Sequence, residues 1–147
     1  MIRLNLPEFE FKITKKDKGF YIFDEIRKKN VKLTPEEWVR QNFLKYLFLY
    51  KNYPVGLTSI EKKIIVNNTI KRFDAVIFNT SAQPILILEC KAPQIKLDNC
   101  VCEQIANYNK IIKSPIAIIT NGLTHYCFAY DYKKNESVLV NEIPDYS

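Results

Sequence analysis

The stretch RFDAVIFNTSAQPILILECKAP, residues 72–93, decides the fold of this chain. Its second half begins as an apolar run typical of a buried strand, but Glu89 and Lys91 stand where further core residues are expected. Side chains alternate along a strand, so these two charged groups share one face with Ile85 and Ile87. The sequence therefore predicts a strand that carries a carboxylate and an ammonium group into the interior.

The first half of the stretch, RFDAVIF, predicts a neighbouring strand that bears Asp74. A hairpin that pairs Phe78 with Ile85 would place Asp74 opposite Glu89, because partner numbers in an antiparallel pair keep a constant sum. Opposed residues have Cβ atoms about 4.5–5.5 Å apart. The register is assumed here, and a slip of one residue would remove the pairing. In this register two carboxylates meet on one face, and Lys91 lies two residues beyond them.

Two facing carboxylates repel each other unless another group offsets their charge. A Mg²⁺ ion would do so, since it favours hard oxygen ligands and needs few of them from the protein. Lys91 beside such an ion would orient a water nucleophile or stabilise negative charge on a phosphate. The alternative is a surface network in which Arg72, opposite Lys91, helps to neutralise the acids. The apolar residues before Glu89 favour a site.

A helix over residues 98–113 is expected to cover this part of the sheet. Its apolar stripe falls at helical spacing, with Gln104 on the same side. An amide directed toward the sheet near Lys91 would suit a phosphate or a water molecule, although Gln104 also fits a residue at the edge of the stripe. Tyr108 alone is more often a core residue than a ligand. The stripe consists of Val101, Ile105, Tyr108 and Ile112.

Another helix begins near residue 34. Thr34 is a suitable N-cap, Pro35 suits the first helical position, and Glu37 stands three residues after the cap, as in a capping box. Pro54 cannot continue the helix. The apolar positions at helical spacing are Val39, Phe43, Leu47 and Tyr50.

The remaining elements predict an α/β fold, a mixed sheet flanked by helices in the order α-β-β-β-α-β-β. A strand over 61–66 precedes the two strands described above, and later strands are expected over 115–120, 123–131 and 137–143, the last as an edge strand. A helix between two of these strands implies a parallel pair. Residues 1–30 are expected to form an N-terminal hairpin extension, from FEFKIT and GFYIFDEI, and residues 31–147 the main domain. KKNVKL, residues 28–33, is expected to be a basic connector.

Composition bounds the classes of function. The chain has 147 residues and a net charge of +6, which permits an anionic partner such as nucleic acid. Four cysteines and one histidine do not have the spacing of a zinc site. No apolar run reaches about 18 residues, and the N-terminus lacks the apolar segment of a signal peptide. We therefore expect a cytoplasmic protein with free thiols and no membrane segment.

Several motifs together resemble a known family. RFDAVIF followed by ILILECKAP resembles the core of the PD-(D/E)XK nuclease superfamily, and QIANY is similar to an element that follows that core in one of its branches. From about residue 20 onward, LTPEEWVRQ, ECKAP, TNGLTHYC and EIPDY resemble small bacterial domains related to the N-terminal nuclease domain of type I restriction enzyme R subunits. The Asp…Glu-x-Lys pattern alone is permissive, whereas four segments in the right order are specific.

The resemblance implies a restriction-endonuclease-like fold and cleavage of DNA assisted by Mg²⁺, with Mn²⁺ as a substitute. Asp74 and Glu89 would hold the metal, and Lys91 would position the attacking water. Gln104 and Tyr108 match the QIANY element and would support the phosphate.

The family often carries an acidic residue on its first helix, which here is Glu36 or Glu37. The pattern before WVRQ favours Glu37 as the catalytic acid, although the capping box already gives that residue a structural role. Glu36 shares a helix face with Val39 and Phe43. Arg40 is then expected to contact a phosphate or carboxylate, with Arg72 as a second nucleic-acid contact.

The resemblance also implies partners. R subunits continue into a helicase motor, whereas this sequence ends at Ser147 and has no Gly-rich phosphate loop, so we expect it to act alone on nucleic acid or with helicase, methyltransferase or specificity subunits. The alternative is a catalytically silent binding or docking subunit. The choice between DNA and RNA and the formation of a homodimer are left open by the sequence.

Overall fold

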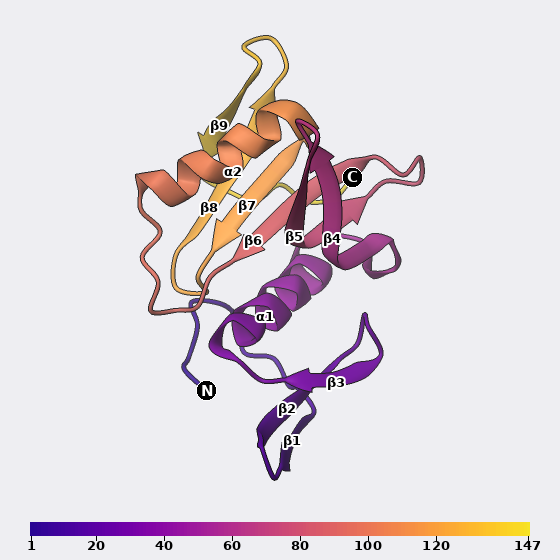
Figure 1. Cartoon of the computed structure of the whole chain (residues 1–147), viewed down its shortest axis with the longest axis vertical. Helices are drawn as coiled ribbons and strands as arrows, with labels where there is room; N and C mark the ends of the chain where they lie inside the picture. The colour runs from indigo at the N-terminus through magenta and orange to yellow at the C-terminus, as the bar shows by residue number, and fades with distance from the viewer.

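A six-stranded sheet forms the centre of the molecule, in the order β4-β5-β6-β7-β8-β9 (Figure 1). The computed structural model describes residues 1–147. The helices are α1 (Pro35–Tyr50) and α2 (Asn99–Ile112), with a 3₁₀ turn over Val55–Leu57. The strands of this sheet are β4 (Thr58–Val66), β5 (Thr69–Phe78), β6 (Pro84–Cys90), β7 (Ile116–Thr120), β8 (His125–Asp131) and β9 (Glu136–Val140).

The sheet is mixed, as the sequence predicts. β6 and β7 are parallel and α2 connects them, whereas every other neighbouring pair is antiparallel. All five residues of β7 are buried, which fits a strand covered on both faces. β9 forms the expected edge. The α/β architecture with the order α-β-β-β-α-β-β is confirmed, with β9 added at the end.

Each helix packs against its own apolar cluster on the sheet. The first cluster joins α1 to Ala75, Ile77, Leu86 and Leu88, and the second joins α2 to Val76, Ile87, Ala117 and Ile119. Because these sheet residues alternate along their strands, the two helices cover opposite faces. The sheet is therefore the middle of three layers. Neither helix is long and apolar enough to cross a lipid bilayer.

α1 begins as predicted, but its capping box is only half formed. Thr34 Oγ1 accepts a hydrogen bond from the Glu37 amide at 3.1 Å. The Thr34 amide donates to the Lys32 carbonyl rather than to Glu37, whose carboxylate is paired with arginines. The expected apolar stripe is buried as far as Leu47, whereas Tyr50 is 56% exposed.

The N-terminal region is more extensive than the expected hairpin. β1 (Ile13–Lys16), β2 (Gly19–Asp24) and β3 (Lys29–Lys32) form a three-stranded antiparallel sheet. The prediction of a connector over residues 28–33 is wrong, and the expected boundary after residue 30 falls inside β3. A turn not recognised in the sequence explains the difference, because the Asp24 carboxylate accepts hydrogen bonds from the amides of Ile26 and Arg27.

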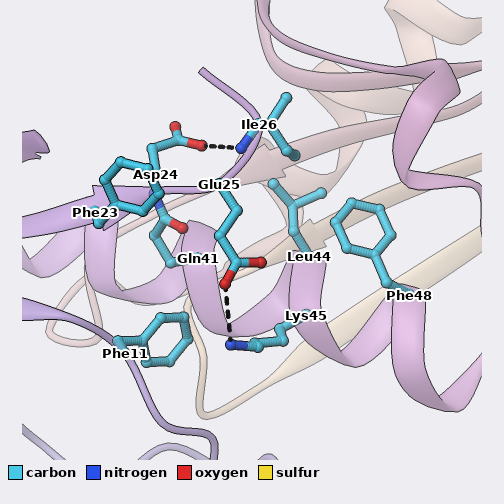
Figure 2. Close-up of a pocket in the computed structure, with 9 residues that line it drawn as sticks. All are labelled: Phe11, Phe23, Asp24, Glu25, Ile26, Gln41, Leu44, Lys45 and Phe48. Atoms are coloured by element: carbon cyan, nitrogen blue, oxygen red, sulfur yellow. Dashed lines mark hydrogen bonds and ion pairs between the residues drawn. The ribbon is translucent and has the colours of Figure 1, made fainter. Parts of the chain in front are cut away.

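The small sheet rests on α1 through the end of β2 (Figure 2). Phe23 and Phe11 lie around a small hollow whose floor is formed by Leu44 and Phe48 of α1. Lys45 Nζ lies 4.6 Å from the centre of the Phe11 ring. The packing of Phe23 near Leu44 and Phe48 fixes one end of the small sheet. The hairpin between β1 and β2 extends away from the body of the molecule (Figure 1).

The first residues of the chain pack on the main sheet. Leu4 is buried in the first cluster, and its side chain contacts Gly122, where a Cβ atom would come within 2.7 Å of Leu4. The φ of +86° at Gly122 also favours glycine. The Asn5 amide donates to the Gly122 carbonyl, and the indole N–H of Trp38 donates to the Ile2 carbonyl at 2.9 Å. The N-terminal segment is thus held at several points.

The hairpin between β5 and β6 has the expected register over most of its length. Ala75 pairs with Leu88 and Ile77 with Leu86. The assumed pair of Phe78 with Ile85 is wrong, since Phe78 pairs with Pro84 across an irregularity after Ile77. Proline has no amide to donate, so the ladder shifts by one residue at the loop and leaves the far end unchanged.

Candidate active site

The candidate site lies where β5 and β6 separate. Their ladder ends at the pair Ala75–Leu88, one position before Asp74 and Glu89. Glu89 Oε1 accepts a hydrogen bond from the Asp74 amide at 3.2 Å, and Asp74 Oδ2 accepts one from the Cys90 amide at 2.6 Å. Each carboxylate thus binds a backbone amide of the other strand. The two acids that the sequence paired are adjacent in the structure.

An irregularity of β4 and β5 accompanies this separation. The ladder between them omits the pair Glu61–Asp74, and Glu61 has a φ of 53°. Strict alternation would place Phe73 with Ala75 on the α1 face, but Phe73 packs in the second cluster with Val76, on the α2 face. The side-chain direction therefore shifts by one residue at Asp74, as at a β-bulge.

The shift brings Lys71 into the site, which the sequence analysis missed. Lys71 Nζ lies 3.4 Å from Glu89 Oε2 and 5.3 Å from the centre of the Tyr108 ring. Alternation alone assigns Lys71 to the face opposite Asp74, so the pattern contained no signal for it. A small pocket of about 10 Å³, room for about one water molecule, lies between the sheet and α2. Its lining is Lys71, Glu89, Lys91, Val101, Gln104, Ile105, Tyr108 and Ile119.

The predicted residues Lys91, Gln104 and Tyr108 are thus brought together with Glu89. The Lys91 amide donates to the Thr120 carbonyl at 2.8 Å, which continues the bonding of β6 with β7 and fixes the backbone of this lysine. Gln104 is exposed at the mouth of the pocket, and Tyr108 packs edge-on against Phe73. Tyr108 therefore has both a packing contact and a place in the site.

The two carboxyl groups resist ionisation. The pKa of Glu89 is raised to about 6, chiefly by burial and next by the charge of Asp74, while Lys71 offsets part of the effect. Burial also raises the pKa of Asp74, although the Cys90 amide and the charge of Arg40 oppose the shift. The fold therefore holds two partly buried acids that favour a nearby positive charge.

We expect Glu89→Gln to stabilise the fold at neutral pH. A carboxyl whose pKa is raised from 4.5 to about 6 contributes stability that is present below pH 4.5 and is lost as the pH rises through 6. The substitution removes this cost, so it should raise the free energy of unfolding by about 2 kcal/mol at pH 7 and change it little at pH 4. Urea unfolding at the two pH values measures the difference.

Glu103→Gln is the matched control, because Glu103 is exposed on α2 and does not line the pocket. It should leave stability unchanged at both pH values. A Glu89→Gln variant that is less stable than wild type at pH 7 would mean that the contacts of Glu89 with Lys71 and the Asp74 amide outweigh the cost of its charge.

Glu37 lies in an ion-pair network next to the site. It is 5% exposed, and its two oxygens accept from different arginines: Arg27 Nη2 at 2.5 Å and Arg40 Nε at 2.6 Å. Glu61 extends the network, with its oxygens 3.7 Å from Arg27 and 3.8 Å from Arg40. Asp24 binds Arg27 Nε from the other side. Both oxygens of Glu37 are thus engaged by arginines.

Glu36 is the acid of α1 on which the charges of the site residues Asp74 and Lys91 act. It is more exposed than Glu37, and burial and the charge of Asp74 raise its pKa, while Lys91 opposes the shift. Arg40 lies between the network and the site, and it binds Glu37. Burial lowers the pKa of Arg40, but the charges of Glu37 and Asp74 raise it above its usual value. The carboxylate partner expected for Arg40 is therefore present.

Arg72 is not brought to the site. It is exposed on β5 and pairs across the ladder with Lys63 of β4. It has no partner on β6, because β5 and β6 have already separated at this level. The expected position opposite Lys91 does not exist in the structure. Lys71, one residue earlier, is the basic residue of β5 that lies beside Glu89.

The donor atoms at the site suit a hard divalent ion. Asp74 and Glu89 supply carboxylate oxygens in a place where the fold favours positive charge, and no cluster of three or more His, Cys, Asp or Glu side chains is present. Mg²⁺ commonly binds through one or two carboxylates and keeps several water ligands. The residues therefore fit Mg²⁺ better than a metal that needs a full set of protein ligands.

Comparison of the sequence with known proteins identifies a family. Residues 35–144 match the family described as the type I restriction enzyme R protein N terminus. The chain belongs to this family. The match extends from the first residue of α1 to beyond β9, so the R protein N-terminal family covers both helices and the whole main sheet. No curated protein matches the sequence.

A solved structure supports the fold of this R protein N-terminal domain. It is a fragment of a proposed HsdR subunit of a type I restriction enzyme from Vibrio vulnificus YJ016, with a TM-score of 0.54 and 18% sequence identity. The alignment covers 77% of this chain and 24% of the solved chain, so this chain spans about a quarter of the length of the protein it matches.

Proposed function

We propose that this domain hydrolyses phosphodiester bonds of DNA with the help of Mg²⁺. The observation that carries the proposal is the pairing of Asp74 and Glu89 through each other's backbone amides, beside a pocket lined by Lys91. Membership of the R protein N-terminal family supports DNA as the substrate. The basic net charge of +6 is consistent with a polyanionic partner.

Asp74 and Glu89 would hold the ion through their carboxylate oxygens. When bound, Mg²⁺ supplies a Lewis acid that stabilises the negative charge developing on the phosphate. Glu36, whose charge reaches Asp74, is the acid of α1 that we assign to the same site. Arg40 balances the charge of Asp74 from the side of α1.

Lys91 would orient the attacking water in the pocket next to Glu89. The water oxygen forms a bond to phosphorus as the bond to the 3′ oxygen breaks; the water loses a proton to solvent, and the leaving 3′ oxygen takes a proton from solvent. The products are a 3′-hydroxyl and a 5′-phosphate. Gln104 and Tyr108, at the α2 side of the pocket, would contact the phosphate, while Lys71 would favour the ionised form of Glu89 and hold its carboxylate in place.

The family context also suggests partner chains. R proteins belong to type I restriction enzymes, so helicase, methyltransferase or specificity subunits are the partners we propose for this domain. The solved relative is about four times longer than the part that aligns, which is consistent with a nuclease-type domain that works beside other modules.

Incubation of the purified chain with supercoiled plasmid tests the proposal. We expect conversion to nicked and linear DNA in the presence of Mg²⁺, and no conversion when EDTA removes the ion. Glu89→Gln should also lose cleavage, although it folds more stably at neutral pH. This combination separates a loss of chemistry from a loss of structure.

Persistent absence of cleavage with Mg²⁺ or Mn²⁺, together with intact DNA binding, would contradict the proposal. The domain would then be a catalytically silent DNA-binding subunit. Cleavage that continues in EDTA would contradict the role of the metal.

A further inference from the structure

The small sheet carries most of the net charge of the chain. Residues 12–32, which we name the basic arm, contain seven lysines and one arginine against three acids, which gives a net charge of +5 out of the total of +6. The other 126 residues are therefore nearly neutral. Since the arm forms only β1, β2 and β3, its charge is concentrated on a narrow element that projects from the body (Figure 1).

The pairing register assigns three of these lysines to one face. Thr14, Tyr21 and Lys32 lie side by side across β1, β2 and β3. Lys12 and Lys16 stand two residues before and after Thr14, so they share its face. Thr14 and all three lysines are exposed. The two acids in or beside β2, Asp24 and Glu25, do not lie in this face, because Asp24 pairs with Lys29 in the alternate rows and Glu25 lies in the turn after β2.

Aromatic rings lie between the basic groups of the arm. On the face of Lys12, Lys16 and Lys32, Lys16 Nζ is 5.0 Å from the centre of the Tyr21 ring. Lys15 pairs with Phe20 on the opposite face, where its Nζ is 6.0 Å from the centre of the Phe20 ring. Phe20 is 52% exposed although it is a large apolar residue. Basic groups that alternate with accessible rings suit a nucleic acid, since lysines bind phosphates and rings contact sugars or bases.

The shape of the arm agrees with a nucleic-acid partner. β3 pairs only with residues 21–24 of β2, so the outer part of the arm is a two-stranded ribbon that ends at Asp17 and Lys18. The inner end of the arm is tied to the candidate site through Arg27, Glu37 and Arg40.

We propose that the basic arm binds the phosphate backbone of DNA outside the candidate active site, through Lys12, Lys16 and Lys32. This inference rests on the proposal that DNA is the substrate. The arm then supplies affinity that does not depend on sequence, while the pocket beside Glu89 acts on one phosphodiester bond. The anion contacts are electrostatic, so each neutralised phosphate releases counterions.

The test is the binding of a fluorescent DNA duplex, measured by anisotropy in Ca²⁺ between about 50 and 200 mM salt. The triple variant Lys12→Gln, Lys16→Gln, Lys32→Gln should weaken binding at low salt by about tenfold or more. It should reduce the slope of log K against log salt by about two to three, since each phosphate contact contributes about 0.9. Each single variant should reduce the slope by about one.

The matched control replaces Lys63, Lys133 and Lys134 with glutamine, which removes the same charge from exposed positions outside the arm. It should leave the slope nearly unchanged. Equal losses in the two triple variants would overturn the inference, because the effect would then come from net charge alone. Wild-type affinity in the arm variant would also overturn it and would favour an acidic protein as the partner of the arm.

The experiment separates the two proposals. Arm-dependent binding without cleavage by the wild-type chain would contradict only the proposed nuclease function. An arm variant that binds DNA with wild-type affinity and cleaves it at the wild-type rate would contradict only the inference about the arm. Melting temperatures of both triple variants should equal that of wild type, because all six lysines are exposed.

Discussion

Lys91→Ala is expected to lower the rate of DNA cleavage by about 10²- to 10⁴-fold while the domain stays folded and still binds DNA. Lys91 lines the pocket beside Glu89, and its backbone is fixed by the bond of its amide to the Thr120 carbonyl. The alanine variant keeps this backbone bond and loses the side chain beyond Cβ, including the ammonium group. The measurement is the single-turnover rate of plasmid nicking in Mg²⁺.

Lys96→Ala is the control for the loss of one positive charge. Lys96 is exposed five residues further along and does not line the pocket, so its removal should not change the rate. Full activity of Lys91→Ala would contradict the mechanism and would direct attention to Lys71, whose ammonium group also lies at Glu89. A double substitution of both lysines would then decide whether either one positions the water.

Glu37→Gln is expected to be the most destabilising conservative substitution in the chain. The carboxylate holds Arg27 and the buried Arg40 together, and the neutral amide would leave the guanidinium of Arg40 without its main partner. Breaking a buried ion pair costs about 3 to 5 kcal/mol. The melting temperature should fall by roughly 10 °C, as measured by circular dichroism.

Glu36→Gln, one residue earlier on α1, gives a matched comparison. It should leave the melting temperature near that of wild type, because Glu36 is exposed and forms no ion pair. Its effect should instead appear in cleavage, since the charge of Asp74 acts on it. The reverse result, a stable but inactive Glu37→Gln and a fully active Glu36→Gln, would assign the catalytic acid to Glu37, as the sequence pattern favours.

The fold was largely predictable from local signals. Thr34 marks the start of α1 by its capping chemistry, whereas the apolar patterns of β5, β6 and β7 report on burial. The structure confirms the elements that these signals predict. The strand β3 was missed because its turn depends on the side chain of Asp24, which forms hydrogen bonds that no periodicity reveals.

The site was predictable only in part. Glu89 and Lys91 follow from alternation, and the constant sum of partner numbers brings Asp74 beside them despite the shifted pair at Phe78. Lys71 was not predictable, because the irregularity opposite Glu61 moves it to the other face. The choice between Glu36 and Glu37 depends on where two arginines from distant segments lie, and spacing along one helix carries no such information.

The contact between Trp38 and the N-terminal segment gives the chain an optical probe. Trp38 is the single tryptophan, its indole donates to the Ile2 carbonyl, and Phe11 packs edge-on at 5.5 Å between ring centres. The intrinsic fluorescence of the protein therefore reports whether the first residues are docked on α1. Since this contact lies apart from the pocket lined by Lys91, emission spectra can follow detachment of the N-terminal segment in any active-site variant without an added label.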